Sequence, residues 1–93
     1  MTREMTLEIR RKASAGTMQS SDLMVVVEPG PALEIAIEST VKKQFEHLIR
    51  ARIQATLDQL GVASGRIQVS DRGALDYAIA ARVETAVRRA SKE

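Results

Sequence analysis

Two adjacent hydroxyl groups, those of Ser20 and Ser21, stand in the polar segment AGTMQSSD just before an apolar run. A serine oxygen can act as a nucleophile when a neighbouring base activates it, or it can serve as a point of covalent attachment. The single histidine, His47, falls on the polar side of the helix expected around it, so we interpret it as a solvated residue. No Ser-His-Asp triad is recognisable in the sequence. Residue chemistry alone therefore assigns no catalytic role to the two serines.

The acidic residues offer no clearer catalytic or metal site. Asp71 and Asp76 lie at the expected start of a helix, where a carboxylate commonly accepts hydrogen bonds from free backbone N–H groups, so we interpret Asp71 as a helix cap. The loops around Gly16 and Gly73 match neither a phosphate-binding loop nor a dinucleotide-binding fingerprint. The chain has no cysteine, which excludes disulfides, thiolate metal sites and a thiol nucleophile of its own. Any thiol chemistry would have to be imported.

Basic residues slightly outnumber acidic ones, with 14 Lys and Arg against 12 Asp and Glu, for a net charge of +2. Such a small excess does not by itself indicate a nucleic-acid-binding protein. Aromatic residues that could stack on bases are limited to Phe45 and Tyr77. We therefore interpret the basic clusters as solvated faces and as cations near a helix C-terminus, and keep a small RNA-binding module as an alternative. The clusters are Arg10-Arg11-Lys12, Lys42-Lys43, Arg50 with Arg52, and Arg88-Arg89.

The length of 93 residues fits one small domain, and 44% apolar residues are enough for it to bury a core. The charged N-terminal residues lack the apolar centre of a signal peptide, and no run of eighteen apolar residues occurs. We expect a cytoplasmic protein with no membrane span. We divide the chain into an N-terminal extension, residues 1–12, in which Leu7 and Ile9 alternate as in a marginal strand, and a folded domain, residues 13–93.

Three segments have the composition or the alternation of β-strands. Residues 23–28, LMVVVE, are rich in β-branched side chains and predict a mostly buried strand. Residues 33–38, LEIAIE, alternate between apolar and outward-facing side chains. PGPA between them breaks regular structure, so we expect these two strands to form an antiparallel hairpin. Residues 66–70, RIQVS, predict a short third strand.

Two longer segments have the apolar spacing of amphipathic helices. The first is capped by Ser39 or Thr40 and ends before Gly61, which suits the left-handed residue that follows a helix. The second follows a turn at residues 70–73 and frays near Ser91. Their apolar stripes are expected to be Val41, Phe45, Leu48, Ile49, Ile53 and Leu57 in the first, and Leu75, Ala78, Ile79, Val83, Ala86 and Val87 in the second.

These elements come in the order β, β, α, β, α, which indicates a single small α+β domain. Neither helix can bury its apolar stripe alone, so we expect both to pack against one face of a small sheet. If the third strand lies beside the second in parallel, the helix between them makes a crossover that should be right-handed. The loop with Ser20 then lies just outside the first strand, anchored at one end and open to other molecules.

Several separated segments, in the same order, resemble the family of the acyl carrier protein, or gamma subunit, of citrate lyase. AGTMQSSDLMVVVEP resembles the family's AGT-x-ESGD or ESSD segment leading into a strand. LEIAIESTVKKQF keeps its V-x-x-QF pattern, and DRGALDYAIAARVETAVRRA resembles its D-x-GAL segment and helical end. The resemblance covers approximately residues 13–91. The sequence differs at Gln19, where Glu is usual, and at Ser21, a position often held by Gly.

The resemblance implies that Ser20 is esterified by a phosphoribosyl dephospho-coenzyme A group, whose thiol carries the acyl group. Register with the family motif selects Ser20 rather than Ser21 or Ser14. In that family, acetyl on the arm is exchanged for citrate, and cleavage of the citryl thioester releases oxaloacetate. The carrier itself needs no base or metal, so the protein would be a non-catalytic subunit. Asp22 could help to present the serine in an Asx-type turn, or could be a plain turn residue.

The resemblance also implies the partners of this chain. They are the citrate lyase alpha subunit, an acyl transferase, the beta subunit, a citryl lyase, and a transferase that attaches the cofactor. It implies an oligomeric complex of citrate fermentation, with neither nucleic acid nor a membrane among the partners. A close alternative is the acyl carrier of malonate decarboxylase, whose cofactor and serine context are similar.

Overall fold

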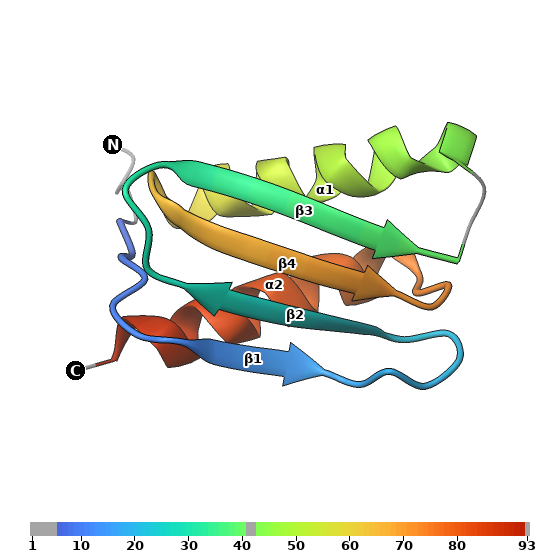
Figure 1. Ribbon diagram of the computed structural model, residues 1–93, viewed down its shortest axis with the longest axis horizontal. Helices are drawn as coiled ribbons and strands as arrows, with labels where there is room; N and C mark the ends of the chain where they lie inside the picture. The colour runs from blue at the N-terminus through green and yellow to red at the C-terminus, as the bar shows by residue number, and fades with distance from the viewer. Residues whose placement is uncertain (1–5, 41–42, 93) are drawn as a thin grey trace.

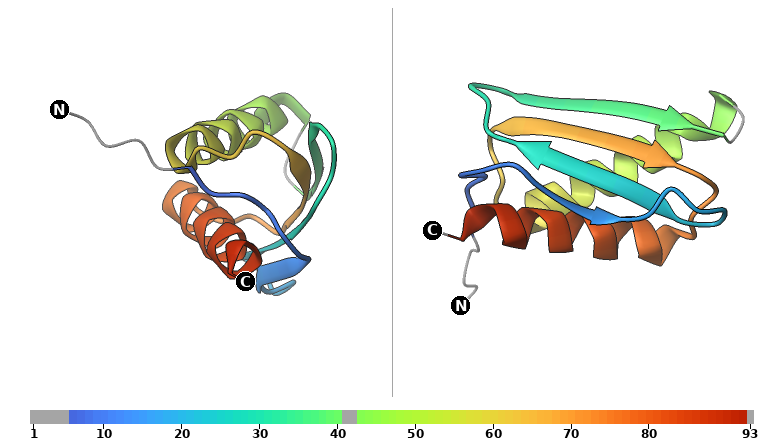
Figure 2. Two further views of the ribbon diagram at one scale, coloured as in Figure 1. Left: turned by 90° about the vertical axis from the view of Figure 1, so that its left-hand side faces the viewer. Right: turned by 60° about the horizontal axis from the view of Figure 1, so that its bottom comes forward.

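The computed structural model describes residues 6–40 and 43–92. A four-stranded sheet has both helices on the same face, so the fold has two layers (Figures 1 and 2). The elements are β1 Ala13–Gly16, β2 Leu23–Glu28, β3 Leu33–Ser39, the 3₁₀ helix η1 Lys43–Phe45, α1 Glu46–Leu60, β4 Gly65–Asp71 and α2 Asp76–Ser91. The prediction of one small α+β domain is confirmed, with one strand added before the predicted elements. Within these described residues, no helix is long and apolar enough to cross a membrane.

The core lies between the sheet and the two helices. In β2, every second residue is fully buried, namely Leu23, Val25 and Val27, because the alternation of a strand turns these side chains to one face. The helix α2 packs against β1 and β2, and α1 packs beside it. The buried apolar side chains of the helices are Ile49, Ile53, Leu57 and Leu60 from α1 and Ile79, Val83, Ala86, Val87 and Ala90 from α2.

The predicted hairpin between residues 23–28 and 33–38 is wrong. The strand order is β1-β2-β4-β3, so β4 lies between β2 and β3, antiparallel to the first and parallel to the second. Ile67 and Val69 of β4 are buried, whereas Ile35 and Ile37 of β3 are half-buried, as suits a strand at the edge of the sheet. The similar alternation in the sequences of β3 and β4 predicted that each is a strand, but it did not show which of the two is more buried and therefore central in the sheet. The parallel pairing considered for the second and third predicted strands is confirmed.

The hairpin of this fold joins β1 to β2, in the register Ala13↔Val27 to Gly16↔Met24. The marginal strand considered at residues 7–9 is absent from the described structure. Instead, this segment runs past the ends of both helices, where the Leu7 N–H donates to the Leu60 carbonyl and the Arg10 N–H donates to the Ala90 carbonyl. These bonds satisfy carbonyl groups that have no partner within a helix.

Both helix C-termini agree with the sequence prediction, whereas the start of the first helix does not. Gly61 has φ 73°, and its N–H donates to the Asp58 carbonyl, so α1 ends where a left-handed residue was expected. Neither Ser39 nor Thr40 caps α1, because the 3₁₀ turn of η1 precedes it and its N-cap is Phe45. The helix α2 ends at Ser91, as predicted. Val41 and Lys42 lie outside the described residues.

Three residues assigned to the apolar stripes are largely exposed. Phe45 is 45% exposed, Leu48 56% and Leu75 60%, and they lie where α1 and α2 begin. The periodicity of a helix predicts a face, but burial also requires a partner opposite that face. Together with Ile49, Ala74 and Ile79, Phe45 and Leu48 line an open groove of about 250 Å³.

Candidate functional site

The loop of residues 17–22 joins β1 to β2 at the end of the sheet where β4 also finishes (Figure 1). Ser20 lies in this loop and is exposed. Among the described residues, no side chain or backbone group forms a hydrogen bond with its hydroxyl. The structure therefore places the serine singled out by the sequence in an exposed loop, where no hydrogen bond from the described part of the chain occupies its hydroxyl.

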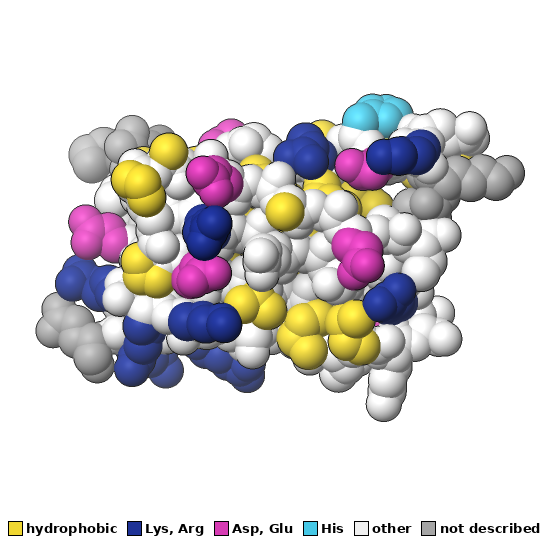
Figure 3. Space-filling view, viewed as in Figure 1, with side chains coloured by type: hydrophobic (Ala, Val, Ile, Leu, Met, Phe, Trp, Pro, Cys, Tyr) yellow, Lys and Arg dark blue, Asp and Glu magenta, His cyan; other side chains and the backbone are white. Residues whose placement is uncertain are grey.

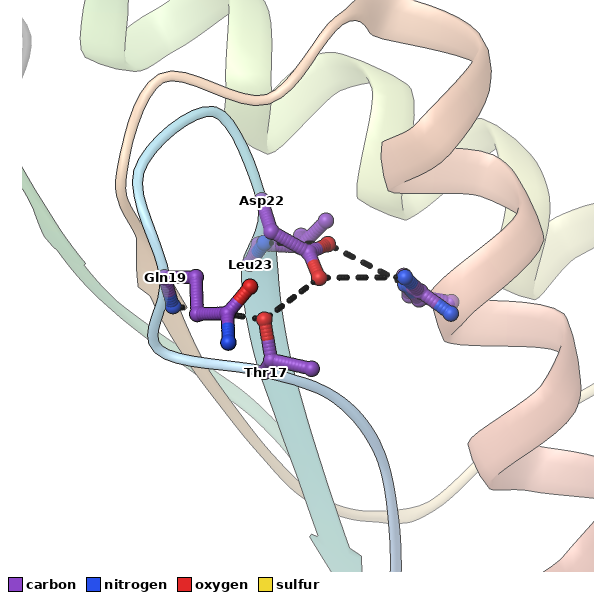
Figure 4. A network of polar contacts seen from close by, with 5 residues as sticks. Thr17, Gln19, Asp22 and Leu23 are labelled. Carbon is purple, nitrogen blue, oxygen red and sulfur yellow. Dashed lines mark hydrogen bonds and ion pairs between the residues drawn. The ribbon is translucent and has the colours of Figure 1, made fainter.

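The carboxylate of Asp22 holds the loop together (Figure 4). Its Oδ2 accepts from the Thr17 hydroxyl at 2.6 Å, and its Oδ1 accepts from the Leu23 N–H at 2.7 Å. The Gln19 N–H donates to the same Thr17 oxygen at 3.2 Å. The Asx-type turn considered for Asp22 does not form, because the carboxylate binds the backbone N–H of the next residue and a side chain across the loop. Asp22 is a structural centre of the loop rather than a plain turn residue.

Arg82 from α2 completes this network. Its Nε donates to Oδ1 of Asp22 at 3.2 Å and its Nη2 donates to Oδ2 at 3.0 Å, the paired geometry that a guanidinium forms with a carboxylate. The Thr17 hydroxyl, the Leu23 N–H and the Arg82 guanidinium lower the pKa of Asp22 from 3.8 to about 2. Asp22 is therefore ionised at neutral pH, and its charge is matched by that of Arg82.

Backbone hydrogen bonds tie the loop to the turn between β4 and α2. The Ser21 N–H donates to the Arg72 carbonyl, and the Arg72 N–H donates to the Asp22 carbonyl, both at 2.8 Å. Within the loop, the Asp22 N–H donates to the Gln19 carbonyl at 3.2 Å. The residues on either side of Ser20 are thus fixed while Ser20 itself faces outward. This arrangement suits a residue that other proteins must reach in a defined position.

Gly16 and Ser21, at the two ends of the loop region, both have backbone conformations that favour glycine. Gly16 has φ 99°, and a Cβ atom there would lie 1.9 Å from the Leu23 carbonyl oxygen, so the position requires glycine. Ser21 has φ 65°, in the left-handed region that glycine adopts without strain. This conformation gives a physical reason for the glycine that the resembling family often has at this position.

The other candidate residues lie away from any catalytic arrangement. His47 is exposed on α1, as predicted. Asp71 is 1% exposed and accepts from the Ser39 hydroxyl at 2.8 Å and from the Ala74 N–H at 3.0 Å. It is not the N-cap of α2, which is Leu75, because the turn before the helix is longer than expected. In residues 6–40 and 43–92, no group of acidic or histidine side chains is arranged to hold a metal ion.

Asp76 forms an ion pair with Arg52 at 2.6 Å, and this contact raises the pKa of Arg52. Basic side chains elsewhere also lie close to acceptors: Arg88 pairs with Glu84 at 2.8 Å, and the Arg89 Nη1 donates to the Ser14 carbonyl at 2.8 Å. A group of Lys and Arg side chains lies toward the end of the molecule where α2 finishes (Figure 3). This placement agrees with cations that complement a helix C-terminus, at the opposite end from the Ser20 loop.

Sequence reasoning missed Thr17 and Arg82 as parts of the site. Arg82 lies 60 positions after Asp22. In the sequence it looks like any other arginine on the solvated face of an amphipathic helix. Thr17 belongs to the AGT segment that carries the resemblance, but nothing in its neighbours in sequence indicates a bond to Asp22. Only the packing of α2 against the hairpin brings these side chains together.

Comparisons with known proteins agree with the fold and the site. The family model described as malonate decarboxylase delta subunit (MdcD), of the ACP family, matches residues 10–90. The citrate lyase acyl carrier protein of Halothermothrix orenii is 49% identical over 87 residues, covering 92% of this chain and 93% of the relative. That of Albidiferax ferrireducens is 52% identical over 85 residues, covering 89% and 87%.

A solved structure has the same fold. It is a chain of a Pseudomonas malonate decarboxylase hetero-tetramer in complex with malonate, with a TM-score of 0.73 and 21% identity, covering 94% of this chain and 91% of that one. At this identity the likeness concerns the fold alone. Acyl carrier proteins hold their acyl group on a covalently attached prosthetic arm. From the match over residues 10–90 and the relatives at 49% and 52% identity, the chain belongs to the citrate lyase acyl carrier protein family.

Proposed function

We propose that this chain is the non-catalytic acyl carrier subunit of citrate lyase and that the Ser20 oxygen carries a phosphoribosyl dephospho-coenzyme A arm. The observation that carries this proposal is the exposed Ser20 hydroxyl in a loop fixed by the Asp22 network. The names of relatives at 49% and 52% identity supply the reaction class. The thiol of the arm would hold acetyl and citryl thioesters while citrate is cleaved to oxaloacetate and acetate.

The residues around Ser20 fit such an attached group. Ser20 is exposed and its hydroxyl forms no hydrogen bond within the described chain, so an ester there requires no repacking. The chain has no cysteine, so the arm would supply the thiol that a thioester needs. Arg72 adjoins the loop through two backbone hydrogen bonds, and its positive charge favours a phosphate group nearby, whereas the charge of Arg82 is matched by Asp22. Ser20 needs no base of its own, since a separate transferase would perform the attachment.

The arm would let one tethered acyl group visit two partner subunits, alpha for acyl transfer and beta for citryl cleavage. Tethering replaces diffusion between the two active sites by a high effective concentration. A loop that is rigid at its base and exposed at Ser20 suits this task, because the anchor stays fixed while the arm moves. We further propose a cytoplasmic location for the complex.

Reconstitution of the lyase complex tests the proposal. The complex would be assembled with wild-type chain, with Ser20→Ala and with Ser21→Gly, each produced together with the cofactor-attaching enzymes. Ser21→Gly is the matched control, because it removes the neighbouring hydroxyl while glycine accepts the backbone conformation at φ 65°. We expect citrate cleavage with the wild type and the control, and none with Ser20→Ala. Full cleavage by the Ser20→Ala complex would contradict the assignment.

A carrier of malonate decarboxylase is the second candidate, because the matching family model has that description and the solved structure belongs to such an enzyme. The two candidates differ in the partners that accept the loaded chain. The same preparation of modified protein would be mixed with the remaining subunits of each complex. Turnover of citrate but not of malonate favours the citrate lyase carrier, and the reverse result favours the alternative.

A further inference from the structure

The turn between β4 and α2 lies beside the loop of residues 17–22 (Figure 1). Arg72 belongs to this turn and is hydrogen-bonded to the loop. Two backbone hydrogen bonds of 2.8 Å hold it there, from the Ser21 N–H to its carbonyl and from its N–H to the Asp22 carbonyl. The main chain of Arg72 is therefore fixed against both residues that follow Ser20. Its position does not depend on its side chain, which is half-exposed.

The Arg72 guanidinium forms no hydrogen bond or ion pair with any residue in ranges 6–40 and 43–92. The neighbouring carboxylates bind other groups: Asp22 is paired with Arg82, and the buried Asp71 accepts from Ser39 and Ala74. Most other described arginines are engaged with a carboxylate or a backbone carbonyl. These are Arg10, Arg50, Arg52, Arg66, Arg82, Arg88 and Arg89.

We propose that Arg72 binds the phosphate that links the prosthetic arm to Ser20. This inference rests on the proposed function, since the phosphate is part of the attached arm. A phosphodiester carries one negative charge and oxygen acceptors that match the donors of a guanidinium. Arg82 neutralises Asp22, so Arg72 contributes the positive charge left beside the loop for an anion on Ser20.

An exposed arginine binds a free phosphate weakly because solvent and salt screen the attraction. Here the phosphate would be covalently attached to Ser20. The N–H of the next residue, Ser21, already donates to the Arg72 carbonyl. Tethering makes the contact intramolecular and raises its occupancy without requiring a deep pocket. The contact would hold the base of the arm near α2 and leave the distal thiol free to move.

Nuclear magnetic resonance of the arginine Nε–Hε groups tests this contact on the full chain, before and after modification. The matched control is Arg11, which is exposed and lies near the end of α2, where its backbone N–H donates to the Ala90 carbonyl; its guanidinium has no partner among the described residues. We expect the Arg72 signal, identified by its loss in Arg72→Gln, to shift on modification while the Arg11 signal stays in place. An unchanged Arg72 signal, in a sample whose Ser20 and Ser21 amide signals have shifted, would overturn the inference.

Melting temperatures give a second readout. Arg72→Gln keeps both backbone bonds, so the variant should fold. We expect modification to raise the Tm of the wild type and of Arg11→Gln by roughly 2–4 °C, and that of Arg72→Gln by less than half as much. Arg72→Lys keeps the charge but not the paired donors and should retain part of the gain. Equal gains in all variants would reject the contact while leaving the attachment at Ser20 intact. If neither the wild-type chain nor any variant acquired the arm, the proposed function would also be contradicted.

Discussion

Arg82 of α2 binds both carboxylate oxygens of Asp22, a residue that precedes it by 60 positions, at 3.2 and 3.0 Å. This contact joins the tip of the β1–β2 hairpin to the helix that covers it. A short hairpin is marginally stable in water by itself. The Asp22–Arg82 pair and the Thr17 hydroxyl therefore explain how an exposed loop can hold Ser20 in a defined position.

The stability of the protein should fall with acid through Asp22. The folded state lowers the pKa of this group from 3.8 to about 2, so its contribution is fully present above pH 4 and is lost as pH falls toward 2. Urea unfolding at several pH values should show a steeper loss between pH 4 and 2 for the wild type than for Asp22→Asn. Parallel curves for the two proteins would contradict the role of the Asp22 carboxylate.

Gly16→Ala should weaken the hairpin that carries the loop. The new Cβ would lie 1.9 Å from the Leu23 carbonyl oxygen, and alanine is strained at φ 99°, so we expect a loss of roughly 2 kcal/mol or more. Gly73→Ala is the matched control, with φ 93° but open space around the Cβ, and should cost about 1 kcal/mol. Chemical denaturation measures both. Equal losses would show that the close approach at Gly16 has no energetic effect.

Ser21→Gly should stabilise the protein. Serine at φ 65° is strained and glycine is not, although glycine also gains freedom in the unfolded chain, so the net gain should be about 0.5–1 kcal/mol. Ser14→Gly serves as the comparison, because Ser14 lies within β1, where glycine weakens a strand. Denaturation midpoints should move in opposite directions for the two variants. A destabilised Ser21→Gly protein would contradict the strained backbone at this position.

Two leucines of α1 should differ in their contribution to stability. Leu57 is fully buried and Leu48 is 56% exposed, so Leu57→Ala should cost about 2–5 kcal/mol and Leu48→Ala less than about 1 kcal/mol. Both substitutions keep a good helix former, which leaves burial as the main difference. Thermal unfolding of the two variants checks the burial pattern. Similar losses would place Leu48 in the core, as its spacing in the sequence had predicted.

The sequence predicted the helices and strands more accurately than it predicted which strands lie side by side. Composition at residues 23–28 and alternation at 33–38 and 66–70 identified three strands, and Gly61 marked the end of α1, because these signals act within a few residues. β1 escaped prediction because ASAG has neither β-branched side chains nor a clear alternation. The order of β3 and β4 depends on which strand is better covered, and that depends on packing from both helices.

The site shows the same division between local and distant information. Ser20 was selected by the resemblance of AGTMQSSD to a family motif, and the structure places it in an exposed loop. The left-handed backbone of Ser21, the bond between Thr17 and Asp22, and the approach of Arg82 are not visible in local patterns. Each is fixed by the path of the chain around the loop or by α2. Leu75, which is exposed, was wrongly assigned to the apolar stripe for the same reason, because periodicity does not show where a helix has no element packed against it.

The location of the attached group tests the central claim most directly. The chain would be produced together with the cofactor-attaching enzymes, digested, and the peptide containing Ser20 and Ser21 analysed by fragmentation mass spectrometry. The account predicts one added group of the mass of phosphoribosyl dephospho-coenzyme A, minus the atoms lost in esterification, on residue 20. The same group on Ser21, or a complex that cleaves citrate with both serines unmodified, would contradict it.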